Sequence, residues 1–487
     1  MSENSSLLRH TLFYLPAQLG PPATQFVLAV LWTYLLDPAT LGVVTFVIAA
    51  QEMTAFIGIT PWSLFMLRFR ARFREGEEAR FNAMDQRMTL LACLVQFLLT
   101  FAILWLLGVS PETPIILATT GYLISRTLLT HYGEWARADH AIAAYTTGQL
   151  IGALAGAALS TIAILIVGPR PESVLGGLAL GQLIALAINY HQLGLRVGFG
   201  VLDREILADV LRYGAGAIIV SGVVGWVAVN INRVIVQYLQ GPEALGLMSV
   251  GWGLGQRIAA VIAMLLTAAA YPLAVQHLER GDRKGALEQI SFNGVFLFGI
   301  LAPTIAGGAL LAAPMTHLLI SSKFHEMTVA IFPVALAASA LRSFRLHTAD
   351  QTMLLLERND VSMRFTVIES VMNIFFCTLG LAVAGVYGAA IGMMIGTAIA
   401  CAGGFFVACV WQGLPAPRTS VVLRILFATM VMALCVRALP TPDNLAGLFL
   451  AILLGALVYA GMTFALFPQC RELVARRMKN RQGAPAA

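Results

Sequence analysis

Five arginines lie inside stretches of chain that are otherwise apolar enough to span a lipid bilayer. They are Arg126, Arg233, Arg257, Arg342 and Arg345. An unpaired guanidinium at the centre of a bilayer costs at least about 2.5 to 3.5 kcal/mol, so such residues usually face a bundle interior or a watery cavity. Guanidinium groups match phosphate with several charge-assisted hydrogen bonds. Their placement therefore indicates an anionic partner.

A polar stripe surrounds one of these arginines. Asn230, Arg233 and Gln237 lie at i, i+3 and i+7, so they share one face of a helix. Polar side chains inside a membrane face protein or water rather than acyl chains. We therefore expect Arg233 and Asn230 to line a cleft and to bind substrate.

The composition is that of an integral membrane protein. The 487-residue chain is 58% hydrophobic and only 11% charged, against a charged share of about 25% in soluble domains. Scanning for apolar runs of about 17 to 25 residues predicts an all-α polytopic membrane protein with about fourteen transmembrane helices. The predicted ranges are 12–35, 40–66, 88–108, 113–133, 141–167, 173–195, 213–239, 245–275, 290–312, 327–355, 361–383, 386–411, 420–438 and 444–467.

The basic residues set the predicted orientation, because Lys and Arg are retained on the cytoplasmic side. With the N-terminus inside, twenty-three of the thirty-one Lys and Arg residues fall in cytoplasmic segments and three fall outside. We therefore expect both termini to be cytoplasmic. The net charge of +6 reflects this bias and gives no nucleic-acid signal, while the basic segments are free to meet anionic lipid headgroups. The first apolar run has no small-residue cleavage site, so we expect it to be retained as a helix.

An internal repeat divides the chain. The segment 34–42, YLLDPATLG, recurs as 238–246, YLQGPEALG, at an offset of 204 residues. Six predicted helices separate the copies, so both halves have the same orientation and form two parallel six-helix lobes. We predict lobes at 1–197 and 213–411, a cytoplasmic linker at 198–212, and two added helices with a basic tail at 412–487. Two lobes imply a cleft, and transporters built from repeats bind substrate at such an interface.

The first predicted helix carries Pro16, Gly20, Pro21 and Pro22 in mid-run. We expect an interruption there, which must face protein or water because lipid cannot satisfy the released backbone groups. Gln25 shares a face with Pro22 and is expected to line the cleft. The alternative is a kinked structural helix whose glutamines bond to neighbours.

One acidic residue is expected opposite an arginine. At the repeat offset, Arg257 corresponds to the neighbourhood of Glu52, so the two are expected to face each other at similar depth. The functional interpretation is a gate or coupling pair that an anionic substrate, or a proton on Glu52, would break. The alternative is a static buried ion pair.

The remaining intramembrane arginines also have two interpretations. Arg342 and Arg345 share a helix face, with Asp350 further along and Glu369 on the next helix. The four residues either contact substrate and couple an ion, or form salt bridges within the second lobe. Arg126 likewise either contacts substrate or pairs with an acid across helices.

Other chemistry finds little support in the sequence. The six cysteines show no CxxC spacing and the eight histidines no HExxH spacing, so neither a disulfide framework nor a metal site is indicated. A Walker motif is absent, so ATP hydrolysis is not supported. We expect no cofactor, and H+ or Na+ as a coupling ion.

Two parts of the chain resemble a known family of membrane proteins. The segment 230–246, NINRVIVQYLQGPEALG, with a helix ending near Pro272 and the loop 279–284, resembles the seventh and eighth helices of polysaccharide-repeat flippases. The segments LERND at 356–360 and GVYGAAIG at 385–392, with Asn373, resemble the eleventh and twelfth helices of that family. The motifs are shared across a superfamily that also includes MATE-type multidrug exporters and lipid II flippases.

The resemblance implies a Wzx-type flippase of the bacterial inner membrane that turns over a lipid-linked oligosaccharide, usually on undecaprenyl pyrophosphate. It also implies that the protein functions together with a polysaccharide polymerase and with partners that set the chain length, in O-antigen or exopolysaccharide synthesis. Two alternatives remain. One is a cation-coupled multidrug exporter of the same fold, although arginines would repel its cations. The other is a membrane polymerase or ligase, although the longest predicted extracytoplasmic loop, 313–326, is too short to hold a catalytic shell.

Overall fold

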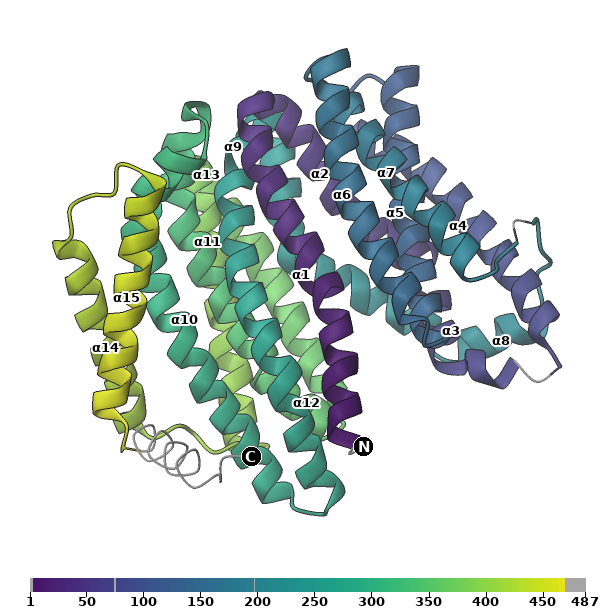
Figure 1. The fold of residues 1–487 in the computed structure, drawn as a ribbon. Helices are drawn as coiled ribbons and strands as arrows, with labels where there is room; N and C mark the ends of the chain where they lie inside the picture. Colours follow the sequence, from purple (N-terminus) through teal and green to yellow (C-terminus); the bar gives the residue numbers. More distant parts are fainter. Residues whose placement is uncertain (1–2, 74–75, 197, 469–487) are drawn as a thin grey trace, which may run out of the picture. The chain divides into compact units, whose positions relative to one another are not determined.

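The apolar runs of this chain fold into helices, because a helix satisfies every backbone group within its own segment and a bilayer offers no other partner. A computed structural model describes residues 3–73, 76–196 and 198–468, and every regular element in these ranges is helical (Figure 1). The chain divides into two compact units, Met1–Val250 and Gly251–Ala487.

The first unit contains eight helices and the start of a ninth. They are α1 Glu3–Leu35, α2 Pro38–Gly58, α3 Thr60–Phe73, α4 Glu78–Leu107, α5 Thr113–Ala138, α6 Ile142–Val167, α7 Pro171–Gln192, α8 Arg204–Arg212 and α9 Ala215–Glu279.

The second unit contains the end of α9 and the remaining helices. They are α10 Arg283–Leu319, the 3₁₀ turn η1 Ser322–Phe324, α11 His325–Leu346, α12 Ala349–Leu355, α13 Asn359–Val410, α14 Thr419–Ala438 and α15 Leu445–Leu466.

Two long helices are bent where the sequence predicts a boundary. α9 is interrupted at Gly241, with φ 84°, between the predicted ranges 213–239 and 245–275. α13 is interrupted at Ala384 and Gly385, the latter with φ 60°, between 361–383 and 386–411. Glycine adopts this left-handed conformation without the steric cost of a Cβ, which is why both turns fall on glycine.

Several predicted boundaries are wrong. The expected interruption of the first helix is absent, since α1 is helical from Glu3 to Leu35; proline is tolerated inside membrane helices when neighbouring groups re-satisfy the backbone. The predicted helix 40–66 is instead broken at Ile59, and 327–355 is broken at Thr348. The predicted linker 198–212 includes the helix α8, and its place as a linker stays a prediction.

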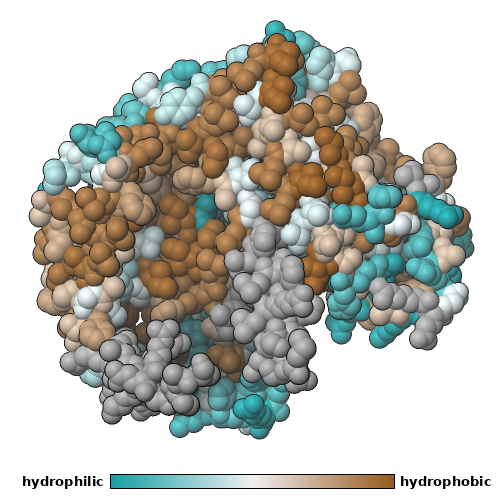
Figure 2. Space-filling view, in the orientation of Figure 1, coloured by the Kyte–Doolittle hydropathy of each residue, from teal (hydrophilic) through white to brown (hydrophobic). Residues whose placement is uncertain are grey.

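The structure supports a polytopic membrane protein. By length and composition, ten helical segments in the described ranges could each cross a membrane. α9 and α13 are each counted once there, although each holds two predicted ranges, so the number fourteen stays a prediction. Figure 2 shows hydrophobic surface over α14 and α15 and hydrophilic surface around α3 and α8.

The two copies of the sequence repeat meet inside the first unit. Gly42 of α2 and Gly246 of α9 are 204 residues apart, and each lies against the backbone of the other copy. A methyl group on Gly42 would lie 1.9 Å from the carbonyl oxygen of Pro242, and one on Gly246 would lie 1.8 Å from that of Pro38. Thr45 Oγ1 donates to Ser249 Oγ at 3.2 Å, again across 204 residues. Corresponding residues therefore face each other across a local pseudo-two-fold axis.

Candidate functional site

The polar stripe of the first unit forms as the spacing predicts. On the first part of α9, Arg233 Nη1 donates to Asn230 Oδ1 at 2.5 Å. One turn further, Gln237 Nε2 donates to the carbonyl oxygen of Leu107 at 3.3 Å. Asn230 and Gln237 are buried, and Arg233 is half-buried. Because the amide of Asn230 orients the guanidinium, the cation is held in place by a neutral partner.

Arg233 retains hydrogen-bonding capacity. Its Nε atom is buried and has no hydrogen-bond partner, and it forms no salt bridge with a carboxylate in the described ranges. Glu52 of α2 interacts with it electrostatically at longer range. A guanidinium with a buried, unbonded N–H can donate to an anionic ligand, and an unmet buried donor costs about 1 to 3 kcal/mol.

Arg126 and Glu52 both lie within electrostatic range of one residue of the first unit. Both act electrostatically on the buried Tyr122 of α5. Glu52 is exposed and Arg126 is half-buried, and no side-chain hydrogen bond or salt bridge joins either one to the parts of the chain that are described. The first unit therefore gathers two half-buried arginines and one acid, with both cations available to a ligand.

The four charged residues predicted in the second lobe form one buried network. Arg342 Nη1 and Arg345 Nη2 both donate to Glu369 Oε2, the latter at 2.9 Å. Arg345 Nη2 also lies 3.6 Å from Asp350 Oδ2. The side chains of Arg345 and Glu369 are each 1% exposed. The charges in this network largely neutralise one another, which favours the salt-bridge interpretation over phosphate contact.

Thr397 completes the network by donating to Glu369 Oε1 at 3.3 Å. The network ties α11, α12 and α13 together, because its arginines lie on α11 and its acids on α12 and α13. Removing one partner of a buried ion pair leaves an uncompensated charge and typically costs about 3 to 5 kcal/mol.

The roles predicted for Arg257 and Gln25 stay predictions. Arg257 belongs to the second unit, where its Nη1 lies close to Gly253 of the same helix. Glu52 belongs to the first unit, so their pairing stays a prediction. Gln25 is exposed on α1, and its place in a cleft also stays a prediction.

A charged clamp lies outside the apolar segments. Arg80 Nη2 donates to Asp203 Oδ1 at 2.8 Å and to Glu205 Oε2 at 2.5 Å. Asp203 also caps α8 by accepting from the backbone N–H groups of Glu205 and Ile206. The hydrogen bond from Arg80 is the main cause that lowers the pKa of Asp203 to about 2. The clamp fixes α8 to the start of α4.

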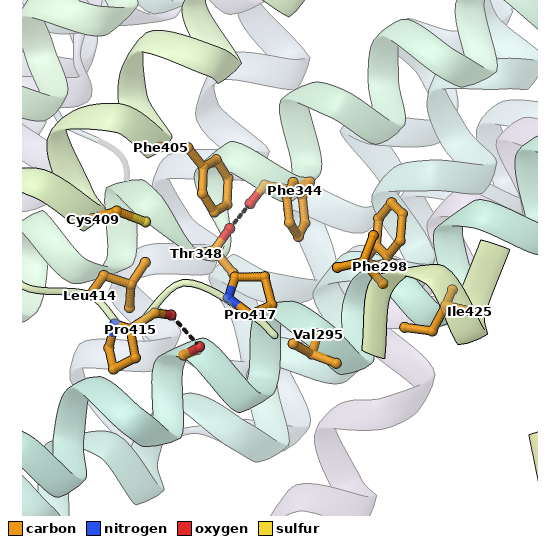
Figure 3. A pocket seen from close by; sticks show the side chains of 13 residues that line it. Val295, Phe298, Phe344, Thr348, Phe405, Cys409, Leu414, Pro415, Pro417 and Ile425 are labelled. Carbon is orange, nitrogen blue, oxygen red and sulfur yellow. Dashed lines mark hydrogen bonds between the residues drawn. The ribbon is translucent and has the colours of Figure 1, made fainter. Parts of the chain in front are cut away.

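An apolar pocket of about 200 Å³ lies in the second unit. Figure 3 shows Phe298, Phe344 and Phe405 around it, with Pro415 and Pro417 of the following loop closing one side. Ser291 Oγ donates to the carbonyl oxygen of Pro415 at 2.6 Å and holds this loop. The lining offers no cation to a phosphate, so the pocket suits hydrocarbon rather than an anionic headgroup.

One buried polar group was missed by the sequence analysis. Asp85 is 3% exposed and accepts hydrogen bonds from Trp62, His131 and Tyr132. The predicted helix 88–108 placed Asp85 in a loop, whereas α4 begins at Glu78. The sequence could have indicated this residue, because the helix of the apolar run 88–108 can extend toward the N-terminus through Asp85.

The fold and the apolar helices define a polytopic membrane protein. The family model described as polysaccharide biosynthesis protein matches residues 7–277, and the chain belongs to this family. A comparison with curated protein sequences found no match.

Solved structures share the fold. The lipid II flippase MurJ, in an inward closed conformation, is 14% identical with a TM-score of 0.77, over 95% of this chain and all of that one. An inward-facing multidrug resistance MATE transporter of the MOP superfamily is 15% identical with a TM-score of 0.56, over 82% of this chain and 98% of that one. A Vibrio cholerae MATE transporter is 15% identical with a TM-score of 0.53, over 84% and 98%. The predicted MATE-like fold is confirmed.

Proposed function

We propose that this protein is a flippase that moves polyprenyl-pyrophosphate-linked oligosaccharide repeat units from the cytoplasmic to the periplasmic leaflet of a bacterial inner membrane. It works by alternating access through a cleft lined by arginines, with both chain ends on the cytoplasmic side. The observation that carries this proposal is Arg233, a half-buried cation with an unbonded, buried Nε atom. Family membership supports a role in polysaccharide synthesis.

The charge of such a substrate suits these arginines. A pyrophosphate headgroup must cross a region of low dielectric while its prenyl tail stays in lipid. Arg233 and Arg126 offset the loss of hydration by charge-assisted hydrogen bonds to phosphate oxygens. With the inside negative, each negative charge moved fully outward gains about 2.3 kcal/mol per 100 mV. The membrane potential, or an H+ or Na+ gradient, supplies the drive.

Glu52 has a different role in this proposal. It lies within electrostatic range of Arg233 and competes with the substrate for the cation. A substrate phosphate that binds Arg233 displaces this interaction, so Glu52 acts as a gating or ion-coupling group. The network of Arg342, Arg345 and Glu369 holds the second lobe together and does not contact phosphate.

A multidrug exporter is the second candidate, because MATE transporters share the fold. Such exporters of cationic compounds require an anionic cavity, and half-buried arginines raise the energy of a cation nearby. A flippase is therefore the better match to Arg233 and Arg126.

The test uses cells depleted of the protein and complemented with variants. Lipid extraction and mass spectrometry measure the polyprenyl-pyrophosphate oligosaccharide that accumulates. We expect complete repeat units to accumulate when the protein is depleted. Wild type and the exposed-arginine control Arg437→Ala are expected to clear them, whereas Arg233→Ala is expected to leave them accumulated. Arg233→Lys keeps the charge but loses the planar fork, so its clearance is expected to be intermediate. Unchanged intermediates together with reduced efflux of cationic compounds would replace the flippase by the exporter.

A further inference from the structure

A buried hydrogen-bonded relay lies where α3, α4 and α5 meet in the first unit. Asp85 Oδ1 accepts from Trp62 Nε1 at 2.7 Å and lies 2.9 Å from His131 Nε2. Asp85 Oδ2 accepts from the hydroxyl of Tyr132 at 3.1 Å. The side chains of Asp85 and His131 are 4% and 0% exposed. Every carboxylate oxygen therefore has a donor although water has almost no access.

The other ring nitrogen of His131 has an adaptable partner. His131 Nδ1 lies 2.8 Å from Ser63 Oγ, and Ser63 Oγ lies 3.2 Å from the carbonyl oxygen of Ile59. With a neutral imidazole, Nε2–H donates to Asp85 and the Ser63 hydroxyl donates to Nδ1. With a charged imidazolium, Nδ1–H donates to Ser63 Oγ and the hydroxyl turns to Ile59.

Both protonation states thus satisfy all the polar atoms without moving a heavy atom. This matters because a buried donor or acceptor left unbonded costs about 1 to 3 kcal/mol. Histidine is also the side-chain type that changes charge near neutral pH. A proton on His131 would neutralise the pair that it forms with Asp85.

Two tyrosine hydroxyls connect the carboxylate to a partly accessible residue. Tyr190, half-buried on α7, donates from its hydroxyl to that of Tyr132 at 2.8 Å, and Tyr132 donates to Asp85. These hydroxyls form a hydrogen-bonded chain from a partly accessible residue to the carboxylate. Arg70 of α3, whose guanidinium lies 3.8 Å from the ring centre of Trp135, is bound by Asp139 at 2.6 and 2.9 Å. The titratable or charged groups near the pair are Tyr132, Tyr190, Cys93, Arg70 and Asp139.

The relay ends at a helix break. Ile59, whose carbonyl accepts from Ser63, is the residue between α2 and α3, with φ −143° and ψ −19°. Uptake of a proton changes the direction of the Ser63 hydroxyl bond at this break. The charge of His131 is thereby connected to the junction of two helices.

We propose that Asp85, His131 and Ser63 form a buried proton-binding site at the break between α2 and α3, and that His131 takes up and releases a proton during transport. The transport part rests on the proposed flippase function, whereas the binding site does not. The three side-chain types also occur in hydrolase triads, but Ser63 is only 6% exposed, so a substrate cannot reach its hydroxyl.

Tryptophan fluorescence of the purified full-length protein tests the site without any transport. Trp62 bonds to Asp85, and the ring of Trp135 lies 6.4 Å from that of His131, so both report on a charge placed there. We expect the fluorescence of wild type and of the exposed control His191→Gln to change with pH in a step that His131→Gln lacks. Identical titrations in all three proteins would overturn the proposal.

Asp85→Asn is the second variant, because it is expected to fold. Its amide oxygen, in the place of Oδ1, accepts from Trp62 and from Nε2–H of a neutral His131, whose Nδ1 accepts from Ser63. Its amide nitrogen, in the place of Oδ2, donates to the hydroxyl of Tyr132, which then donates to Tyr190. This arrangement satisfies the buried atoms but removes the charge that holds a proton on the ring. Loss of the step in Asp85→Asn supports the site, and its persistence overturns it.

Transport in reconstituted vesicles separates the two parts of the proposal. We expect the initial flipping rate of wild type to change at least about threefold between pH 6 and pH 8, and the rate of His131→Gln to be flat. If wild type does not flip lipid-linked oligosaccharide but its fluorescence step depends on His131, the flippase function fails and the proton site stands. If both proteins flip with the same pH profile and titrate alike, the proton site fails and the flippase function stands.

Discussion

Replacing Gly42 with alanine places a methyl group against backbone atoms that have no rotamer to adjust. The added Cβ would lie 1.9 Å from the carbonyl oxygen and 2.8 Å from the carbonyl carbon of Pro242, and 3.0 Å from the amide nitrogen of Gly246. To relieve this clash, α2 must move away from α9. Overpacking usually costs about 1 to 3 kcal/mol, while glycine to alanine inside a helix returns about 1 kcal/mol. Because the clash is with backbone, we expect a net loss of about 2 kcal/mol.

The assay is the thermal midpoint of the purified protein in detergent, measured for Gly42→Ala, Gly246→Ala and Gly176→Ala. A methyl group on Gly176, within α7, has nothing within 4 Å, so this control is expected to keep or raise the midpoint. Both crossing variants are expected to lower it, and by similar amounts because the two contacts are related by the repeat. Equal midpoints for all three variants would refute the close crossing of the repeat copies.

Two further substitutions test the charged groups. Glu369→Gln leaves Arg342 and Arg345 facing a neutral amide, so we expect a loss of about 3 to 5 kcal/mol, seen as a lower thermal midpoint than that of the exposed control Glu326→Gln; equal midpoints would contradict the network. In the folded protein the pKa of Asp203 is about 2, below the ordinary aspartate value of about 3.9. The ionised carboxylate therefore stabilises the fold above about pH 4. This stabilisation is lost as the pH falls through about 2. Asp203→Asn is therefore expected to lower the midpoint equally at pH 6 and pH 8, and by less than Asp203→Ala, which also removes the N-cap worth about 1 kcal/mol; a loss that differs between the two pH values would contradict this assignment.

Much of the helical framework could be predicted because its signals are local. Apolar runs long enough to span a bilayer are read directly from the chain, and the bends at Gly241 and Gly385 fall between predicted helices. The repeat was also visible, since its two copies keep the Pro and Gly residues that the close crossing at Gly42 and Gly246 requires.

The errors arose where tertiary contacts outweigh local pattern. The prolines of α1 suggested a break, yet the helix continues through them. The break at Ile59 has no proline or glycine at the residue itself, and Gly58 directly before it lies in an apolar run that predicts one continuous helix. Local pattern therefore placed one helix end where none occurs and missed another.

In the candidate site, too, local contacts could be predicted and contacts between distant residues could not. The contact of Asn230 with Arg233 follows from helical spacing, and it could be predicted. The relay of Asp85 and His131 joins residues 46 positions apart, and no spacing rule connects them. The choice between phosphate contact and salt bridges for Arg342 and Arg345 needed the position of Glu369 on another helix.

The central claim is that the protein carries an anionic lipid-linked sugar across a bilayer. It is tested most directly by placing purified protein in vesicles that contain a polyprenyl-pyrophosphate oligosaccharide and following the exposure of the sugar to a membrane-impermeant lectin. The account predicts that wild type exposes the inner-leaflet sugar faster than vesicles without protein, and that Arg233→Ala does so more slowly than Arg437→Ala. Exposure at the same rate with and without wild-type protein, in vesicles under an inside-negative potential, would contradict it.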